Sequence, residues 1–534
     1  MKLRIKDTFN KKLPADPNRN NTTREVFESC FSYVSPQKPL NPTLIHVSLE
    51  MAELLGLNED DIISEAFLEF VSGSNILKDT NPYAMCYGGH QFGNWAGQLG
   101  DGRAINLTEV EHNKKRWALQ LKGAGKTPYS RSADGLAVLR SSIREHLCSE
   151  AMHYLGVPTT RSLSLSLSGD KVLRDIMYDG HVAYEKGAIV CRVAPCFIRF
   201  GNFEIFASRG DIETLQTLTN YTIKEFYPEI ESGSKEGYIA FFSEVVNNTM
   251  EMIVHWQRVG FVHGVMNTDN MSIHGLTIDY GPYGWLEDYD PEWTPNTTDK
   301  QIKRYRFGNQ PQIALWNLYQ LANALFPLVK ETEPFLEILE NFDVEYKQKY
   351  SSMMRDKLGL KEQFESDKKL ISDLNKTLKL TETDMTIFFR NLANVKKSME
   401  ITEDLTFLEP VMEAFYKPEE LADTFYKPEE IENVVDVNWR IWFKAYFDRL
   451  KLEELSDLER KAEMNKVNPK YVLRNYMAQL VIDEADKGDY SLLDEVHRML
   501  KQPYNEQPGF QKWFSKRPEW ARDKVGSSML SCSS

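Results

Sequence analysis

Two stretches of the chain have clear hydrophobic periodicities. From Trp117 to Lys122 every second side chain is apolar, which predicts a strand with Lys122 facing away from its apolar side. From Leu136 to Leu155 apolar residues recur with helical spacing, and Glu145 falls nearly opposite the main apolar stripe, within a second one. An unpaired carboxylate is costly there, so we expect Glu145 to pair with Lys122. A solvated Glu145 without a fixed partner is the alternative that periodicity leaves open.

The periodicity changes along the chain and predicts four parts. Residues 1–75 read as a lead-in of proline-bearing loops with one short helix from Val47 to Leu55. Residues 76–200 alternate Gly-rich turns with short β-patterned runs, whereas helical periodicity dominates residues 201–330 and a charge-rich extension over residues 331–534. A sheet-rich segment before a large helical one indicates an α+β fold. It is also the order of the two lobes of a protein kinase.

One short motif occurs twice in the extension. Phe415–Glu420 and Phe425–Glu430 share the sequence FYKPEE. Two copies are too few for a repeat architecture. Proline in a first turn followed by glutamate favours two helix starts.

Composition limits the classes of partner. The 534 residues carry a net charge of −14, which argues against a general nucleic-acid-binding surface but permits a local basic pocket. No apolar run reaches the roughly 18 residues that a membrane span needs, and the N-terminus lacks the apolar stretch of a secretory signal. We therefore expect no membrane insertion. The expected location is the cytoplasm, or the mitochondrion if the source is eukaryotic.

The most informative motif is His263–Asn270 followed by Asp279–Gly281. Its frame is that of the protein-kinase catalytic loop H-R-D-L-x-x-x-N, with D-Y-G where kinases have the magnesium-binding D-F-G. Val265 occupies the position of the kinase Asp that accepts the substrate's proton, and valine can neither take a proton nor bind a metal. The pattern predicts a metal–nucleotide site without the usual base.

Three collinear segments carry a resemblance to a known family. They are NPYAMCYGGHQFGNWAGQLGDGR, LQLKGAGKTPYSRSADGLAVLRSSIREHL and HGVMNTDNMSIHGLTIDYGPYGWLEDYDP. The chain resembles the selenoprotein O family (SelO), protein adenylyltransferases with a pseudokinase fold, from about Phe27 to Ser534. The resemblance implies a two-lobed kinase-like fold with a small sheet-rich N-lobe, a large helical C-lobe and additional C-terminal helices. It also implies transfer of AMP from ATP to Ser, Thr or Tyr hydroxyls of target proteins.

A glycine-rich turn precedes the predicted strand. Gly97–Arg103 could present backbone N–H groups to a phosphate beside a fixed positive charge, although such a turn alone is more often a hairpin. Gly123–Thr127 is similar to the end of a Walker A loop, but Gln120 stands where its first glycine must be, which rejects a P-loop NTPase. The resemblance implies that the nucleotide is contacted by Gly100, Gly102, Arg103, Lys122, Asp134, Gly135, Arg192, Arg199 and Asp279.

Roles within that set come from chemistry and from the family. Arg192 and Arg199 suit bidentate phosphate binding, and the family uses the matching arginines on the ATP phosphates; alone they would more often form surface salt bridges. Asn270 and Asp279 offer the hard oxygen ligands that Mg²⁺ or Mn²⁺ prefers. Family analogy assigns Asp269 as the proton acceptor. It also implies that ATP lies inverted relative to kinases.

Three functional hypotheses follow: a nucleotidyltransferase, a true phosphotransferase and a non-catalytic nucleotide-binding scaffold. Val265 counts against the second, and the retained metal ligands count against the third. The resemblance leaves room for UMP transfer from UTP with Mn²⁺. The sequence predicts neither the protein substrates nor the oligomeric state.

The six cysteines form neither a disulfide framework nor a C-x-x-C metal pair. We expect five to be core thiols. Cys532 lies third from the end between serines, where a thiol is accessible. The family has selenocysteine or cysteine at the matching place, which implies a redox role; an unimportant frayed tail is the alternative.

Overall fold

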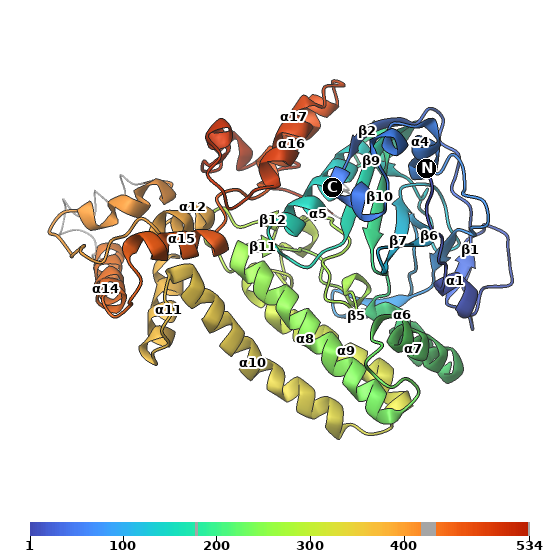
Figure 1. The fold of residues 1–534 in the computed structure, drawn as a ribbon, viewed down its shortest axis with the longest axis horizontal. Helices are drawn as coiled ribbons and strands as arrows, with labels where there is room; N and C mark the ends of the chain where they lie inside the picture. Colours follow the sequence, from blue (N-terminus) through green and yellow to red (C-terminus); the bar gives the residue numbers. More distant parts are fainter. Residues whose placement is uncertain (177–179, 418–433, 532–534) are drawn as a thin grey trace.

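The sheet-rich part of the protein is built around one large antiparallel sheet. The computed structural model describes residues 1–176, 180–417 and 434–531, and Figure 1 shows the sheet in blue and teal beside the helices. Its strands run in the order β1-β3-β6-β7-β10-β9-β2, and β8 pairs with β10. The strand bounds are Phe31–Tyr33 (β1), Thr43–Val47 (β2), Tyr83–Met85 (β3), Ala104–His112 (β6), Lys115–Lys122 (β7), Ala137–Val138 (β8), Arg161–Asp175 (β9) and Val182–Ala194 (β10).

The strand predicted to carry Lys122 is a central member of this sheet. β7 pairs with β6 on one side and with β10 on the other, and Lys122 lies opposite Ala104 and Val190. The last five residues of β7 are buried, because neighbouring strands and covering elements enclose both faces at this end. Lys122 is therefore fixed at the buried end of a strand.

The helix predicted over residues 136–155 is α5, Leu139–Tyr154. It begins later than predicted because residues 137–138 form β8 against β10. The helix packs on β9 and β10, and nearly all of its residues are buried, including charged ones. A helix buried on all sides needs internal partners for those charges.

Residues 1–75 are more ordered than the sequence suggested. The helix predicted from Val47 to Leu55 is confirmed as α2 (Leu49–Leu54). The expectation of a single helix is wrong, since this fully described stretch also contains α1 (Phe9–Lys12), α3 (Glu59–Ile62) and α4 (Glu65–Ser72). Asn58 forms a capping box with Asp61, and Ser64 caps α4. Side-chain caps stabilise the starts of these helices. The helices are too short for a hydrophobic periodicity to reveal them in the sequence. The same stretch supplies both edge strands of the sheet, β1 and β2.

Helices dominate from residue 200 onward, as predicted. Figure 1 shows α8, α9 and α10 as long rods beside one another, and α16 and α17 above α5. A second hydrophobic core lies among the later helices, from the end of α10 to α15. The bounds are Phe200–Arg209 (α6), Ile212–Phe226 (α7), Lys235–Val259 (α8), Gln310–Val329 (α9), Glu333–Leu358 (α10), Ser366–Thr377 (α11), Met385–Leu392 (α12), Val434–Leu450 (α14), Asp457–Val467 (α15), Asn475–Ala485 (α16) and Ser491–Leu500 (α17).

Two small sheets and short 3-10 helices complete the described structure. The strand pairs are β4 (Gly88–Gln91) with β5 (Asn94–Gln98), and β11 (Phe261–Val262) with β12 (Gly284–Trp285). The 3-10 helices are η1 (Thr268–Asn270), η2 (Thr297–Asp299), η3 (Phe307–Asn309), η4 (Thr406–Ala414), η5 (Pro508–Trp513) and η6 (Glu519–Ala521).

The predictions for the cysteines, the FYKPEE duplicate and membrane insertion have different outcomes. Five cysteines are buried free thiols, as expected: Cys30, Cys86, Cys148, Cys191 and Cys196. Cys532 and most of the FYKPEE duplicate lie outside the described residues, so the redox role and the two helix starts stay predictions. Among the described helices, none has the length and apolarity to span a bilayer.

Candidate active site

A cavity of about 710 Å³ lies where the sheet-rich part meets the loop that carries the kinase-like motif. The sheet-rich part contributes the turn after β5, the end of β7 and the loop before β8, and the helical part contributes residues between Val265 and Pro282. Ten of the residues expected at the site line this cavity: Gly100, Gly102, Arg103, Lys122, Asp134, Gly135, Arg192, Asp269, Asn270 and Asp279.

Two further expected residues lie behind the cavity wall and hold the others. Glu145 of α5 receives Lys122 Nζ at 2.5 Å on one carboxylate oxygen and Arg192 Nη1 at 3.1 Å on the other. Arg199, at the start of α6, reaches Asp279 Oδ2 with Nη1 at 2.5 Å. Arg192 Nη1 also lies 2.5 Å from Asp279 Oδ1. The structure thus joins five residues from β7, α5, β10, α6 and the D-Y-G loop into one network.

Burial and the neighbouring charges both shift the pKa values of this network. Burial lowers the pKa of Lys122, and Glu145 offsets part of that effect. Burial opposes ionisation of Asp279, but Arg199, Arg192 and Lys122 hold the pKa of its carboxyl well below the usual range. Asp279 also has a left-handed backbone (φ +56°), which is rare for a residue with a side chain and typical of functional positions.

Each arginine of the network keeps a spare hydrogen-bond donor. Nε of Arg192 and Nη2 of Arg199 are buried without a hydrogen-bond partner in the described structure. A buried guanidinium N–H without an acceptor is costly unless a ligand satisfies it. Phosphate oxygens are negatively charged acceptors and suit a guanidinium donor.

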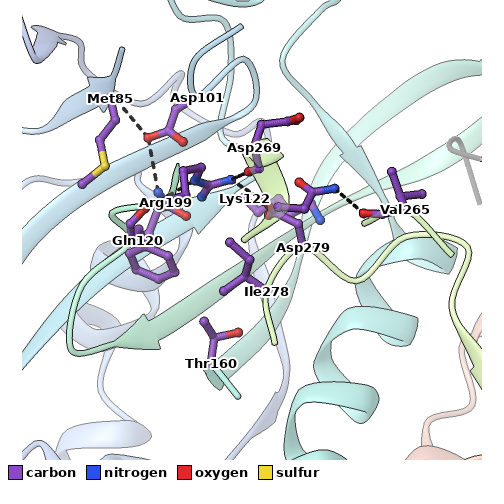
Figure 2. Close-up of polar contacts among 12 residues, drawn as sticks. Met85, Asp101, Gln120, Lys122, Thr160, Arg199, Val265, Asp269, Ile278 and Asp279 are labelled. Atoms are coloured by element: carbon purple, nitrogen blue, oxygen red, sulfur yellow. Dashed lines mark hydrogen bonds and ion pairs between the residues drawn. The ribbon is translucent and has the colours of Figure 1, made fainter. Parts of the chain in front are cut away.

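A series of hydrogen bonds between buried polar side chains holds Arg192 in place. Arg192 Nη2 donates to Gln120 Oε1, and Gln120 Nε2 in turn lies 3.2 Å from Asn106 Oδ1 and 3.4 Å from Asp101 Oδ2. Figure 2 shows Asp101 accepting from the Met85 N–H, a bond of 2.9 Å. These contacts fix the glycine-rich turn to the sheet.

Packing requires a glycine at position 100 within that turn. Gly100 has φ +78°, and a Cβ there would lie 2.4 Å from the ring of Tyr129. Backbone and ring therefore approach more closely than any side chain permits. The turn lies at the rim of the cavity, and its phosphate binding stays a prediction.

Asp269 stands on η1, facing the cavity from the helical part. Its main-chain oxygen accepts from Arg199 Nη1 at 2.9 Å, as Figure 2 shows. Burial raises the pKa of its carboxyl to about 7. Its Oδ1 has no hydrogen-bond partner in the described structure, and Oδ2 accepts from Gln91 at 3.3 Å. A carboxylate so placed can accept a proton near neutral pH.

Comparison with known proteins decides the family. The family model described as "Protein adenylyltransferase SelO" matches residues 18–501. The chain belongs to the SelO family. A Flavobacterium johnsoniae protein named protein nucleotidyltransferase YdiU is 62% identical over 100% of this chain and 99% of its own length. Proteins of the same name from Rhodopirellula baltica and Aromatoleum aromaticum are 54% and 50% identical, each over 100% of this chain and 99% of their own length.

Membership in the SelO family makes the protein a nucleotidyltransferase, as the sequence predicted. It also agrees with the mixed α+β architecture, sheet-rich first and helical afterwards. Residues of the kinase-like frame at 263–281 and of the glycine-rich turn at 97–103 line the same cavity.

The donor set of this SelO site fits a magnesium ion. Asn270 Nδ2 donates to the Val265 carbonyl at 2.9 Å, which leaves the amide oxygen available as a ligand. Asp279 adds a carboxylate that stays ionised. No group of three or more His, Cys, Asp or Glu suited to a metal occurs in the described parts of the chain. Mg²⁺ characteristically takes one or two protein oxygens and completes its shell with phosphate and water.

Sequence reasoning missed several cavity residues of this SelO protein. Arg174 near the end of β9 binds Asp134 through both guanidinium Nη atoms, at 2.7 and 2.8 Å. Only the fold of β9 against β10 brings these residues together, and no local pattern marks Arg174. Gln91 and Asn267 also line the cavity. Both lie within the segments that carry the family resemblance, which was the available signal.

Proposed function

We propose that this chain transfers AMP from ATP to Ser, Thr or Tyr hydroxyls of target proteins and releases pyrophosphate. One observation carries the proposal. Lys122, Arg192, Asp269, Asn270 and Asp279 line a single cavity, while the place of the kinase base is filled by the half-buried valine at position 265. Anion-binding and metal-binding groups are present, and the available base is a different carboxylate.

The roles follow from the contacts. Lys122 and Arg192 provide cations for the outer phosphates at the cavity wall, and Arg199 adds positive charge from behind it. The spare N–H of Arg192 suits a phosphate oxygen, and that of Arg199 suits one that reaches deeper. Gly100, Gly102 and Arg103 form the rim against which the nucleotide lies, and Asp134 and Gly135 belong to the facing loop. With ATP inverted relative to a kinase, the α-phosphate faces the acceptor.

In the reaction, the acceptor hydroxyl oxygen forms a bond to the α-phosphorus, and the bond from that phosphorus to the bridging oxygen of pyrophosphate breaks. Asp269 takes the hydroxyl proton. Asn270 and Asp279 would hold Mg²⁺ or Mn²⁺, which supplies positive charge to the phosphates. Lys122 and the arginines neutralise charge on the departing pyrophosphate.

The architecture belongs to the same proposal. We assign the sheet-rich part, centred on residues 76–200, as a kinase-like N-lobe and residues 201–330 as a C-lobe, with residues 331–534 as a helical extension. Support comes from the pair between Lys122 on β7 and Glu145 on α5, which occupy the places of the kinase lysine and its helix glutamate. Residues 1–75 add edge strands to the N-lobe sheet.

Labelled nucleotides test the proposal directly. Protein substrate incubated with the enzyme and Mg²⁺ should acquire label from α-labelled ATP and none from γ-labelled ATP. Label from γ-labelled ATP would show a kinase, and label from neither, with ATP still bound, would show a scaffold. A parallel reaction with α-labelled UTP and Mn²⁺ measures the competing UMP transfer, and faster labelling from UTP would replace AMP in the proposal.

A further inference from the structure

The β4–β5 hairpin is joined to the loop that carries Asp269 by a run of hydrogen bonds. The His90 N–H donates to Thr268 Oγ1 at 2.7 Å, and Gln91 Nε2 donates to Asp269 Oδ2 at 3.3 Å. The Phe92 N–H donates to Tyr305 OH at 3.0 Å. Three consecutive hairpin residues thus bind η1 and the neighbouring Tyr305, although these partners lie far away in the sequence.

The hairpin also restricts the second carboxylate oxygen of Asp269. A Cβ added at Gly89 would lie 2.8 Å from Asp269 Oδ1 and 2.9 Å from its Cβ. The backbone of β4 therefore lies against this side chain with no room for a methyl group. Gln91 holds Oδ2 and Gly89 bounds Oδ1, so both ends of the carboxylate are constrained by one strand.

Two contacts keep the hairpin itself in place. His90 Nδ1 lies 2.6 Å from Glu204 Oε1 on α6. Phe92 has a left-handed backbone (φ +50°), which a residue with a side chain adopts only when its surroundings hold it there. Its N–H is held by Tyr305 OH and, at 3.3 Å, by Asn267 Oδ1. The strained turn is the conformation that places Gln91 beside Asp269.

We propose that Gln91 is a positioning residue for the base: it donates to Asp269 and, with the backbone at Gly89, sets the carboxylate for the acceptor hydroxyl. This rests on the proposed function, because it gives Gln91 a role only through Asp269. A base misplaced by about 1 Å loses on the order of 10²-fold in rate, which makes such a clamp valuable.

Gln91→Met tests the role, since methionine keeps the length of the side chain and removes the donor. We expect kcat for AMP transfer to fall roughly 10-fold to 100-fold, with the Kd for MgATP unchanged. Gly89→Ala should lower kcat similarly by displacing Asp269. The matched controls are Gln216→Met, on the exposed face of α7, and Gly509→Ala, where an added Cβ has no neighbour within 4 Å. Both should transfer as wild type does.

A second background separates positioning from general structure. In an Asp269→Asn enzyme the base is already lost, so adding Gln91→Met should lower the residual rate by less than about twofold. An equal loss in both backgrounds, or weakened MgATP binding with kcat unchanged, would overturn the inference. If wild-type enzyme transfers no α-label at all, the proposed function fails. If wild type transfers and Gln91→Met retains the full kcat, only the role of Gln91 fails.

Discussion

Helix α5 carries two buried glutamates whose surroundings differ in one decisive respect. Glu150 is closed: Oε1 accepts from Arg161 Nε at 2.7 Å and the Ser162 N–H at 3.2 Å, and Oε2 accepts from Arg161 Nη2 and Ser48 Oγ, each at 2.7 Å. One carboxylate thus meets one guanidinium, and both oxygens are bonded twice. Such a pair has nothing left for a ligand.

Glu145 belongs to the opposite kind of network. Lys122, Arg192 and Arg199 provide three cations for the carboxylates of Glu145 and Asp279, and both arginines retain an unpaired donor. Buried donors without acceptors cost folding free energy. Burial alone therefore does not distinguish a functional site from a structural ion pair. Clustered cations with unused hydrogen-bond donors beside a cavity do distinguish it.

The largest effect should come from Asp279, which faces the excess cations. Asp279→Ala should reduce transfer of α-label roughly 10²-fold to 10³-fold, because the charge that places the metal and the arginines is lost. Thermal unfolding should show that the variant folds, and Asp448→Ala, on the exposed face of α14, is the control. A folded Asp279→Ala enzyme with wild-type activity would erase the contrast between the two networks.

The closed network predicts the reverse outcome. Glu150→Ala strands the buried Arg161 guanidinium and should lower the free energy of unfolding by about 3–5 kcal/mol. The transfer rate per folded molecule should stay at the wild-type value, because Glu150 does not border the cavity. Urea unfolding and initial rates measure the two quantities. Lost activity with unchanged stability would mean that Glu150 serves the reaction and not the fold.

A histidine cluster beside Glu150 extends the comparison to pH. His46 Nδ1 and His146 Nε2 lie 2.8 Å apart, and the rings of His46 and His497 are 4.4 Å apart. Burial lowers the pKa of all three, that of His497 to about 4. The carboxylates of Glu50 and Glu150 oppose this lowering at His46 and His497, whereas Lys501 adds to it. These contacts join β2, α5 and α17.

Because folding depresses these pKa values, only the unfolded chain gains protons as pH falls from about 6.5 to about 4. The stability that this cluster contributes should therefore be greatest above pH 6.5 and decline through that window, by on the order of 3 kcal/mol for His497 alone. His497→Phe should flatten the decline in the free energy of unfolding. An unchanged pH profile in this variant would show that the decline has another source.

The smallest expected effect is the coupling between Lys122 and Glu145 in the network beside the cavity. Lys122→Ala and Glu145→Ala should each impair transfer, and the double variant should lose less than the sum, with a coupling of about 0.5–3 kcal/mol. The rates of wild type, both single variants and the double variant close the cycle. Strict additivity would mean that the 2.5 Å contact between these side chains has no functional weight.

The sequence by itself determined the elements and the chemistry that local pattern encodes. Alternation placed Lys122 on a strand, helical spacing placed Glu145 on α5, and the spacing of Asn270 and Asp279 after His263 marked the kinase-like loop with Val265 in place of the base. These features depend on neighbours within a few turns or strands. Family resemblance added the remaining site residues.

Only the tertiary structure decided which groups are paired and which are spare. Arg174 reaches Asp134 through the β9–β10 pairing, and Gln91 reaches Asp269 through a strained hairpin. The two glutamates look alike in sequence, because both lie on one helix whose residues are nearly all buried. Whether a buried carboxylate meets one cation or several depends on strands far away in the chain, because Coulomb energy and desolvation follow distance in space and not separation in sequence.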